Sequence, residues 1–542
     1  MIGKTASNPA RFLSCHAYGV GHGREGVCLL LRMGEHRILL DCGLNDISPL
    51  LESSAPPADL VFCSHAHADH ARGLLFLHQH FPDLPIYGSE VTSHLLPLNW
   101  PEGQKTEPFC RILPWRSPIT LSENLQIQLF PAGHLPGAAA IVLSCQTPQR
   151  DYTAIYTGDF CLSNSRLADG LSVESLRGFS PDVAIVEGSY GSARHPRRRQ
   201  LEQQLMGKIH AALLLGHSVL LPVPTMGLAQ EILMLLRSHH QFTGRDLDVW
   251  VDEEIGATCD IYLNILPHLP ASVRNFASHQ PLFWDDRVLP RVRRLPKAGI
   301  DEISTLPCVL LVDRRDRWQQ YCQPRDREWT VLFPEYPGRT AMPHPELLED
   351  FPNIALETYL LAEHSDGRNT AQLIHNIRPQ HVLFVHGSPT YLADLIALEE
   401  LQNRYQLHSP ASGMSVDLPV GDRFIQPPPP TLVPYEGEIV ELDNNTIQML
   451  LPPSLSQSSH WRTFADTGLI EARWQGDELV LRGLTQRELL SQSRRPLPAI
   501  EENCENCEHQ VHKRCFNHKS PLYGLQVTLQ GCCPVFEPKK NE

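Results

Sequence analysis

Short apolar runs, separated by Gly, Pro, Asp and His, recur along the first part of the chain. The runs at 26–31 (GVCLLL), 36–40 (HRILL), 60–63 (LVFC) and 183–186 (VAIV) are mostly apolar, and 125–130 (LQIQLF) alternates. Short apolar runs bounded by turn residues are typical of buried β-strands, and alternation predicts a strand with one buried face. We therefore expect a strand-rich, layered fold in this part.

The pattern changes after residue 200. Segments 201–215 and 227–237 have apolar residues at helical spacing, whereas 218–222 (SVLLP) and 249–252 (VWVD) have the length and composition of strands. Strands that alternate with helices are typical of a parallel sheet. The sequence thus predicts a second α/β unit, over 191–345.

A strand–helix–strand crossover is expected at 359–385, with a histidine after each strand, His364 and His386. Histidines at strand ends also mark the first part of the chain, so this later segment is expected to complete the same domain. The sequence therefore predicts a first domain made of 1–190 and 346–425, interrupted by an insertion.

The apolar run at 60–63 leads into 64–70 (SHAHADH), which holds four potential metal ligands: His65, His67, Asp69 and His70. In extended chain, His65 and His67 lean to the same side. Neutral imidazoles suit a borderline cation such as zinc. Asp69 and His70 fall at the start of an expected helix and could serve a second position. The spacing predicts a two-metal site, and the alternative is a histidine-rich surface loop.

Several other expected strands are also followed by an acid or an imidazole. These residues are Asp41, His134, Asp159, Glu187, His364 and His386. Any one of them could belong to a capped turn or be a satisfied core histidine. Ligand sites in layered α/β folds collect on the loops at one edge of a sheet, so the set as a whole predicts one site.

Length and charge narrow the possibilities. A chain of 542 residues is long enough for several domains, and its net charge of -15 disfavours a protein coated in nucleic acid. Basic runs at 194–199 (RHPRRR) and 287–297 (RVLPRVRRLPK) could still contact phosphates, or be solvated faces. No apolar stretch approaches the about 18 residues of a membrane span. We therefore expect no membrane contact and a cytoplasmic location.

The chain after residue 425 differs in composition. The run 425–430 (IQPPPP) predicts a stiff, extended linker. Segment 426–500 is expected to form a small β-rich module that binds RNA or a protein partner, or supports a homodimer. The end, 501–542, is rich in cysteine and contains Cys504, Cys507, Cys515 and Cys532. Such a set could close a structural zinc site, and the alternative is a tail with free thiols.

Nine segments, in their order and spacing, resemble the β-CASP branch of the metallo-β-lactamase fold, which includes RNase J and the cleavage and polyadenylation endonuclease. They are LLDCG (39–43), HAHADH (65–70), AGHLPGAA (132–139), YTGDF (156–160), EGSYG (187–191), LPVPTMGLAQEILMLL (221–236), VDEEIGATCDIY (251–262), EHSDG (363–367) and VHG (385–387). The resemblance covers about residues 15–425. It implies an α/β fold, a metallo-β-lactamase αββα sandwich with an inserted β-CASP α/β domain, followed here by a small β-rich and Cys-rich C-terminal module.

The resemblance also implies a centre with two zinc ions. One ion would be held by His65, His67 and His134, and the other by Asp69, His70 and His386, with Asp159 as the bridge. Asp41 would support a ligand from behind. The resemblance assigns catalysis to Asp69, to His364 as the donor of a proton to the departing ribose oxygen, and to Glu187, which orients His364.

The implied activity is zinc-dependent hydrolysis of single-stranded RNA, in RNA processing or decay. His386 favours the RNA-processing members, because the DNA-repair members usually have valine there. The alternatives are a catalytically weak scaffold of the same fold, a DNA-directed nuclease and a small-molecule hydrolase. Both endonuclease and 5′ exonuclease modes stay open. Segments 309–317 and 333–339 depart from the family pattern near the substrate phosphate, so different substrate contacts are expected there.

Overall fold

The computed structural model describes most of residues 13–420 and pieces of the end of the chain. The described residues are 13–22, 25–100, 107–148, 150–296, 306–315, 317–322, 327–335 and 353–420, the backbone of four strands between 438 and 484, and parts of 504–539. The chain divides into two units, Met1–Pro429 and Pro430–Glu542, and each is described by itself. None of the described helices is long and apolar enough to cross a membrane.

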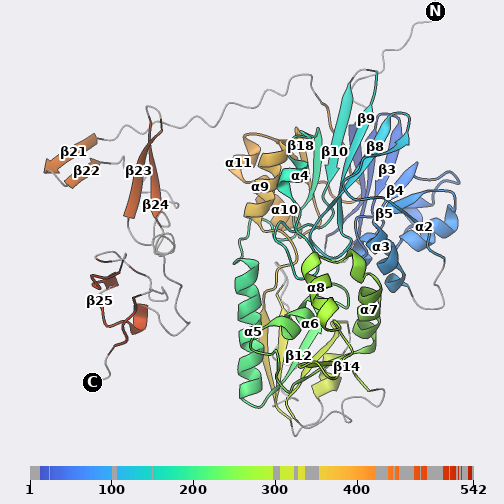
Figure 1. The fold of residues 1–542 in the computed structure, drawn as a ribbon. Helices are drawn as coiled ribbons and strands as arrows, with labels where there is room; N and C mark the ends of the chain where they lie inside the picture. Colours follow the sequence, from blue (N-terminus) through green and yellow to red (C-terminus); the bar gives the residue numbers. More distant parts are fainter. Residues whose placement is uncertain are drawn as a thin grey trace, which may run out of the picture. The chain divides into compact units, whose positions relative to one another are not determined.

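Two mixed sheets pack face to face in the first unit (Figure 1). The first sheet has the order β20-β1-β2-β3-β4-β5-β6, with β1 (Leu13–Val20), β2 (Val27–Met33), β3 (His36–Leu40), β4 (Leu60–Phe62), β5 (Ile86–Gly88), β6 (Cys110–Ile112) and β20 (Ser415–Asp417). The second has the order β19-β18-β11-β10-β9-β8-β7, with β7 (Ile119–Ser122), β8 (Leu125–Pro131), β9 (Ala139–Gln146), β10 (Asp151–Tyr156), β11 (Val183–Glu187), β18 (His381–Val385) and β19 (Gln406–His408). Buried apolar side chains of both sheets, among them Leu29, Phe62, Ile141 and Leu383, form one cluster.

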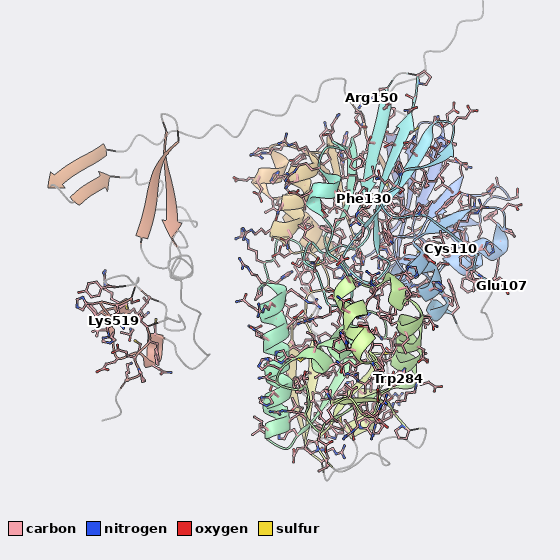
Figure 2. The ribbon with its side chains drawn as sticks, viewed as in Figure 1. Glu107, Cys110, Phe130, Arg150, Trp284 and Lys519 are labelled. Atoms are coloured by element: carbon pink, nitrogen blue, oxygen red, sulfur yellow. The ribbon has the colours of Figure 1, made fainter. Side chains whose placement is uncertain are left out.

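Helices cover the outer faces of the two sheets. They are α1 (Ala68–Ala71), α2 (Leu74–His80) and α3 (Glu90–Leu95) beside the first sheet, and α4 (Val173–Leu176), α9 (Gly367–Ile377), α10 (Pro389–Ile396) and α11 (Glu399–Gln402) beside the second (Figure 1). Helix α9 buries Thr370, Leu373, Ile374 and Ile377, the spacing of one helical face. On the outer side of β8, Phe130 packs edge-to-face with Phe179 at 5.8 Å (Figure 2). These four layers confirm the predicted αββα sandwich.

A third sheet forms the predicted inserted α/β domain. Its order is β14-β13-β15-β12-β16-β17, with β12 (Ser218–Val223), β13 (Asp248–Val251), β14 (Arg291–Arg294), β15 (Val309–Asp313), β16 (Trp329–Pro334) and β17 (Ile354–Tyr359). All its pairings are parallel. Strand β12 is buried throughout, as expected of a central strand covered on both faces. The accompanying helices are α5 (Arg198–Leu214), α6 (Leu228–Ser238), α7 (Glu253–Asn264) and α8 (Ala271–His279).

The prediction of a strand–helix–strand crossover at 359–385 is wrong. The strand that precedes His364 is β17, which pairs with β16 in the inserted sheet, whereas β18 pairs with β11 in the second sheet. Leu361 and Ala362 are buried where the chain passes between the two domains. A short apolar run of this kind cannot be told from a buried strand by hydrophobicity alone. The inserted sheet thus includes a strand beyond the predicted boundary at residue 345.

The second unit contains short antiparallel hairpins in its described part. They pair β21 (Glu438–Asp443) with β22 (Thr446–Leu450), β23 (Leu469–Gln475) with β24 (Glu478–Leu484), and β25 (Gln510–Val511) with β26 (Arg514–Cys515). Cys504, Cys507 and Cys515 are buried, and Cys532 lies outside the described residues. Among the residues described in this unit, no three ligand side chains converge on one point. The zinc site of the tail stays a prediction.

A buried ion-pair network joins the inserted domain to the first domain. Glu231 of α6 accepts hydrogen bonds from the backbone amides of Arg166 at 3.0 Å and Leu167 at 2.7 Å. The same carboxylate pairs with Arg198 of α5 at 3.0 Å, and the two side chains are 9% and 12% exposed. Arg198 also donates to the carbonyl of Ala362 at 2.6 Å. The network therefore fixes α5 and α6 to two segments of the first domain.

We predict that Glu231→Gln lowers the free energy of unfolding of this unit by about 3 kcal/mol, because it removes the carboxylate that compensates a buried guanidinium. Urea unfolding followed by tryptophan fluorescence measures the change. The control is Glu357→Gln, which breaks the exposed pair of Lys208 with Glu357 (39% and 49% exposed). That change should cost less than about 1 kcal/mol. Equal effects of the two substitutions would contradict the role given to the network.

Candidate metal centre

Parallel strands deliver the candidate ligands to one edge of the facing sheets. Strand β3 ends just before Asp41, and its parallel neighbour β4 leads into the loop of His65 and His67. In the second sheet, β10, β11 and β18 are also parallel neighbours; β10 precedes Asp159, and β18 precedes His386. Carboxyl ends of parallel strands meet at the same edge, which is where ligand sites of α/β folds form. Residues more than 300 positions apart are thereby brought together.

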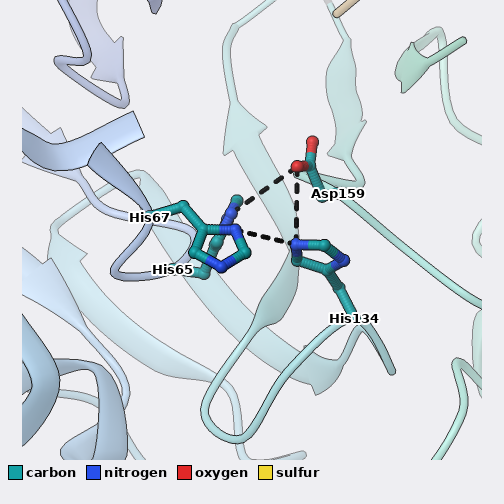
Figure 3. Close-up of side chains that lie close together, drawn as sticks. All are labelled: His65, His67, His134 and Asp159. Carbon is teal, nitrogen blue, oxygen red and sulfur yellow. Dashed lines mark hydrogen bonds and ion pairs between the residues drawn. The ribbon is translucent and has the colours of Figure 1, made fainter. Parts of the chain in front are cut away.

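His65, His67, His134 and Asp159 form the first ligand group (Figure 3). Their ligand atoms all lie within 4.8 Å of one another. Asp159 Oδ2 is 3.6 Å from His65 Nε2 and 3.7 Å from His134 Nε2. His134 Nε2 is 3.0 Å from His67 Nδ1. Three imidazoles and one carboxylate are a donor set that suits zinc and other borderline cations.

Asp69, His70 and His386 form the second ligand group, again with ligand atoms within 4.8 Å of one another. His386 Nε2 is 3.4 Å from Asp69 Oδ2. His70 Nε2 is 3.3 Å from Asp159 Oδ1, the oxygen that does not face the first group. A carboxylate whose two oxygens face different ligand groups is able to bridge two cations.

Glu187 and His364 lie beside these groups. His364 Nδ1 is 3.0 Å from Glu187 Oε1 and 3.9 Å from Asp159 Oδ2. Glu187 Oε1 also accepts a hydrogen bond from the backbone amide of Phe160 at 3.0 Å. The backbone thus fixes the carboxylate, and the carboxylate fixes the ring of His364.

Asp41 supports the second group from behind and is fully buried. Its oxygens accept hydrogen bonds from the amide and hydroxyl of Ser64 at 2.6 and 2.7 Å, and from the hydroxyl of Tyr156 at 2.5 Å. His70 Nδ1 is 2.7 Å from the carboxylate. Because the carboxylate only accepts, Nδ1 donates to it, and Nε2 of His70 is thereby directed at the ligand group. Asp41 also has a φ of 59°, a conformation that is uncommon for residues other than glycine.

Burial keeps the histidines of the first group neutral. Burial lowers the pKa of His67 to about 4 and that of His134 to about 3. The pKa of His65 lies well below its usual value for the same reason. Neutral imidazoles have the free lone pair that a metal ligand needs.

Carboxylates reverse the effect of burial for the other histidines. Burial disfavours the charged form of His386, but Asp159, Asp69 and Glu187 together outweigh it, and the pKa is raised to about 10. For His364, burial is likewise outweighed by Glu187, so its pKa lies above the usual value. Burial acts against ionisation of Glu187, yet His364 and other partners lower its pKa to about 2. These shifts favour the charged form of His364, and Glu187 is ionised near pH 7.

Three buried ligand-type atoms in these groups have no hydrogen-bond partner. They are His65 Nε2, His70 Nε2 and Asp159 Oδ1; the last two are 3.3 Å apart as an ion pair but make no hydrogen bond. A buried polar atom without a partner costs on the order of 1–3 kcal/mol, so natural proteins rarely leave three of them together. Divalent cations would satisfy all three. The donor set and its unsatisfied atoms therefore fit a pair of metal ions.

The structure brings all the core residues predicted from the sequence into this one site; whether they bind metal or catalyse stays a prediction. Contacts from the backbone were not foreseen. His67 Nε2 is 3.3 Å from the carbonyl of Met226, and His134 Nδ1 is 2.8 Å from the carbonyl of Glu363. A backbone carbonyl has no sequence signature. The hydroxyl of Tyr156 lay within a recognised motif, but only its distance to Asp41 reveals its role.

Comparisons with known proteins agree with this geometry. Residues 36–223 match the family described as a beta-lactamase superfamily domain. The chain is 51% identical over 533 residues to an uncharacterized protein of Synechocystis sp., with 96% of each chain covered. It is 32% identical over 234 residues to a probable RNase of Methanocaldococcus jannaschii, covering 39% of this chain and 54% of that protein. It is 26% identical over 271 residues to an RNase J-like protein of the same organism, covering 47% and 61%.

The matched segments thus span about half to three fifths of the two archaeal relatives, 54% and 61% of their lengths. Three features of the structure support the same family assignment: the αββα sandwich, the α/β domain inserted after β11 and the ligand groups at the sheet edge. The chain belongs to the β-CASP family of the metallo-β-lactamase superfamily.

Proposed function

We propose that the chain is a zinc-dependent nuclease that hydrolyses phosphodiester bonds in single-stranded RNA. The observation that carries this proposal is the convergence of two ligand groups on opposite oxygens of Asp159, with the charged His364 beside them. Relatives named as RNases support RNA as the substrate. When bound, two cations would lower the pKa of the attacking water and offset the charge of the phosphoryl group.

Residues of the chain itself supply the proton for the leaving group. His364 is held through Nδ1 by Glu187, so its Nε2 is the atom that donates a proton to the departing ribose oxygen. The raised pKa of His364 favours the form that carries this proton. In the second group, Asp69 contacts His386 and Asp159 contacts His70. Glu187 keeps the ring of His364 in place.

The bound metal is the first prediction of this proposal. The purified chain is expected to contain about two zinc ions in the core by elemental analysis, and a chelator should abolish RNA cleavage until zinc is added back. Asp159→Asn should lose both the metal and the activity, because it weakens the carboxylate shared by both groups. Asp151→Asn, at an exposed position of β10, is the control and should retain both. A metal-free chain that cuts RNA at full rate would refute the proposal.

The proton donor can be tested separately from the metal. His364→Ala is expected to lower kcat by about 10²–10⁴-fold, the usual contribution of general acid–base catalysis, with the zinc content unchanged. The assay is cleavage of end-labelled RNA, with DNA of the same sequence as a comparison. His279→Ala, exposed on α8, is the matched control. Cleavage by His364→Ala at the rate of the unmodified chain would rule out this role.

The pH dependence checks the same assignment. A proton donor must be charged, so the rate should fall as pH rises through the raised pKa of His364, above 6.5. In Glu187→Gln the stabilising carboxylate is gone, the pKa of His364 falls, and this alkaline decline should move to lower pH. An unchanged or upward-shifted decline would contradict the pairing.

The basic run 194–199 lies beside the loop that carries His364. The backbone amide of His195 donates to Asp366 Oδ2 at 3.4 Å. Asp366 lies two residues after His364, the proposed proton donor. Within the run, Arg198 belongs to the buried network, and the exposed arginines are Arg194, Arg197 and Arg199. Positive charge at the start of a helix opposes the helix dipole, so these arginines do not serve the stability of α5. We propose that they bind RNA phosphates.

Replacing these three arginines by Gln should weaken RNA binding and reduce the slope of log affinity against log salt by about 2, since each phosphate contact contributes about 0.7 on a single strand. Binding is measured in the His364→Ala background, in which the RNA is not cut. The control replaces three exposed arginines elsewhere in the first unit, Arg111, Arg116 and Arg274. Equal salt slopes for both triple variants would place the phosphate contacts elsewhere.

A further inference from the structure

Ser189 lies between the carboxylate of Glu187 and the ring of His386. Its hydroxyl contacts Glu187 Oε2 and is 2.8 Å from His386 Nδ1. Its backbone amide also donates to Glu187 Oε2, at 3.2 Å. The serine is thus held from two sides, and it joins the residue that orients the proton donor to a residue of the second ligand group.

The hydroxyl can donate in one direction only. A serine has one hydroxyl proton, and an ionised carboxylate accepts hydrogen bonds but donates none. The proton therefore goes to Glu187, and the serine oxygen accepts a hydrogen bond from His386 Nδ1. When the proton on Nε2 is displaced by a bound metal, the neutral imidazole that is left keeps its proton on Nδ1 and has its lone pair on Nε2. Nε2 is the atom that lies 3.4 Å from Asp69 Oδ2.

The choice of the nitrogen that carries the proton matters because both ring nitrogens of His386 face carboxylates. Nδ1 is 3.4 Å from Asp159 Oδ1, and Nε2 is 3.4 Å from Asp69 Oδ2. The backbone of His386 is already fixed, because its amide donates to the carbonyl of Val20 at 2.7 Å and its φ is 53°. The backbone does not determine the rotation of the His386 ring or the ring nitrogen that carries the proton.

We propose that Ser189 is a positioning residue that keeps the proton of His386 on Nδ1 and presents Nε2 to the metal of the second ligand group. This inference rests on the metal chemistry of the proposed function. It gives Glu187 two roles, one on each carboxylate oxygen. Oε1 orients His364, and Oε2 acts through Ser189 on His386. The proton donor and the second metal position are thereby fixed by the same carboxylate.

The test measures metal affinity on the full chain, by competition between zinc and a chromophoric chelator. Ser189→Ala should weaken one of the two core zinc ions by about 10–100-fold, the usual effect of losing a partner of a metal-ligating histidine. The other ion should bind as before. Ser189→Thr keeps a hydroxyl and should restore the affinity. Ser192→Ala, exposed three residues before His195, is the control and should leave both ions unchanged.

Kinetics provide a second readout that a general loss of structure would not give. In Ser189→Ala, the zinc concentration for half-maximal RNA cleavage should rise by the same factor as the dissociation constant. Two wild-type zinc affinities in Ser189→Ala would overturn this inference and leave the proposed function intact. Loss of both ions in Ser189→Ala and also in Ser189→Thr would show a structural role and overturn it too. An unmodified chain that binds no zinc would overturn both proposals.

Discussion

The site depends on the buried carboxylate of Asp159, which is 2% exposed. Four imidazoles approach its oxygens to between 3.3 and 3.7 Å, those of His65, His70, His134 and His386. An isolated charge in such a place is very costly, so the carboxylate requires positive charge nearby. Protons on histidines meet the requirement in part, as the raised pKa of His386 indicates. Metal ions meet it fully, and because they compete with those protons, metal binding is linked to pH.

Holding these groups in place is the task of the surrounding fold. The ligands come from helix α1 and from the loops after β4, β8, β10 and β18, and the strands themselves are anchored in a buried apolar core. The supporting residues act from behind the ligands: Asp41 on His70, and the carbonyl of Glu363 on His134. The network of Glu231 and Arg198 ties the inserted domain to the same region. Precision at the site thus follows from contacts that involve no ligand atom.

The sequence was informative where chemistry and periodicity coincide. A polar residue at the end of an apolar run, as at His65, Asp159 or His386, is visible in the pattern, and parallel pairing then predicts that such residues meet. The partner of a strand is not visible in its own residues, which is why the strand that leads to His364 was assigned to the wrong sheet. The role of Ser189 was likewise hidden, because a serine after a strand is ordinary and only its two neighbours define it.

The unusual segment after β15 bears on how a substrate phosphate is met. In segment 309–317, where different substrate contacts are expected, Asp313 is 4% exposed and accepts hydrogen bonds from the amide and Nε of Arg315 at 2.9 and 2.7 Å. Its charge is thus compensated within the segment, and one arginine is used in doing so. An acid compensated in this way leaves little free negative charge to oppose a phosphate. Under the proposed function, attraction for RNA would come from exposed cations near His364, and the arginines that precede and begin α5 have that position.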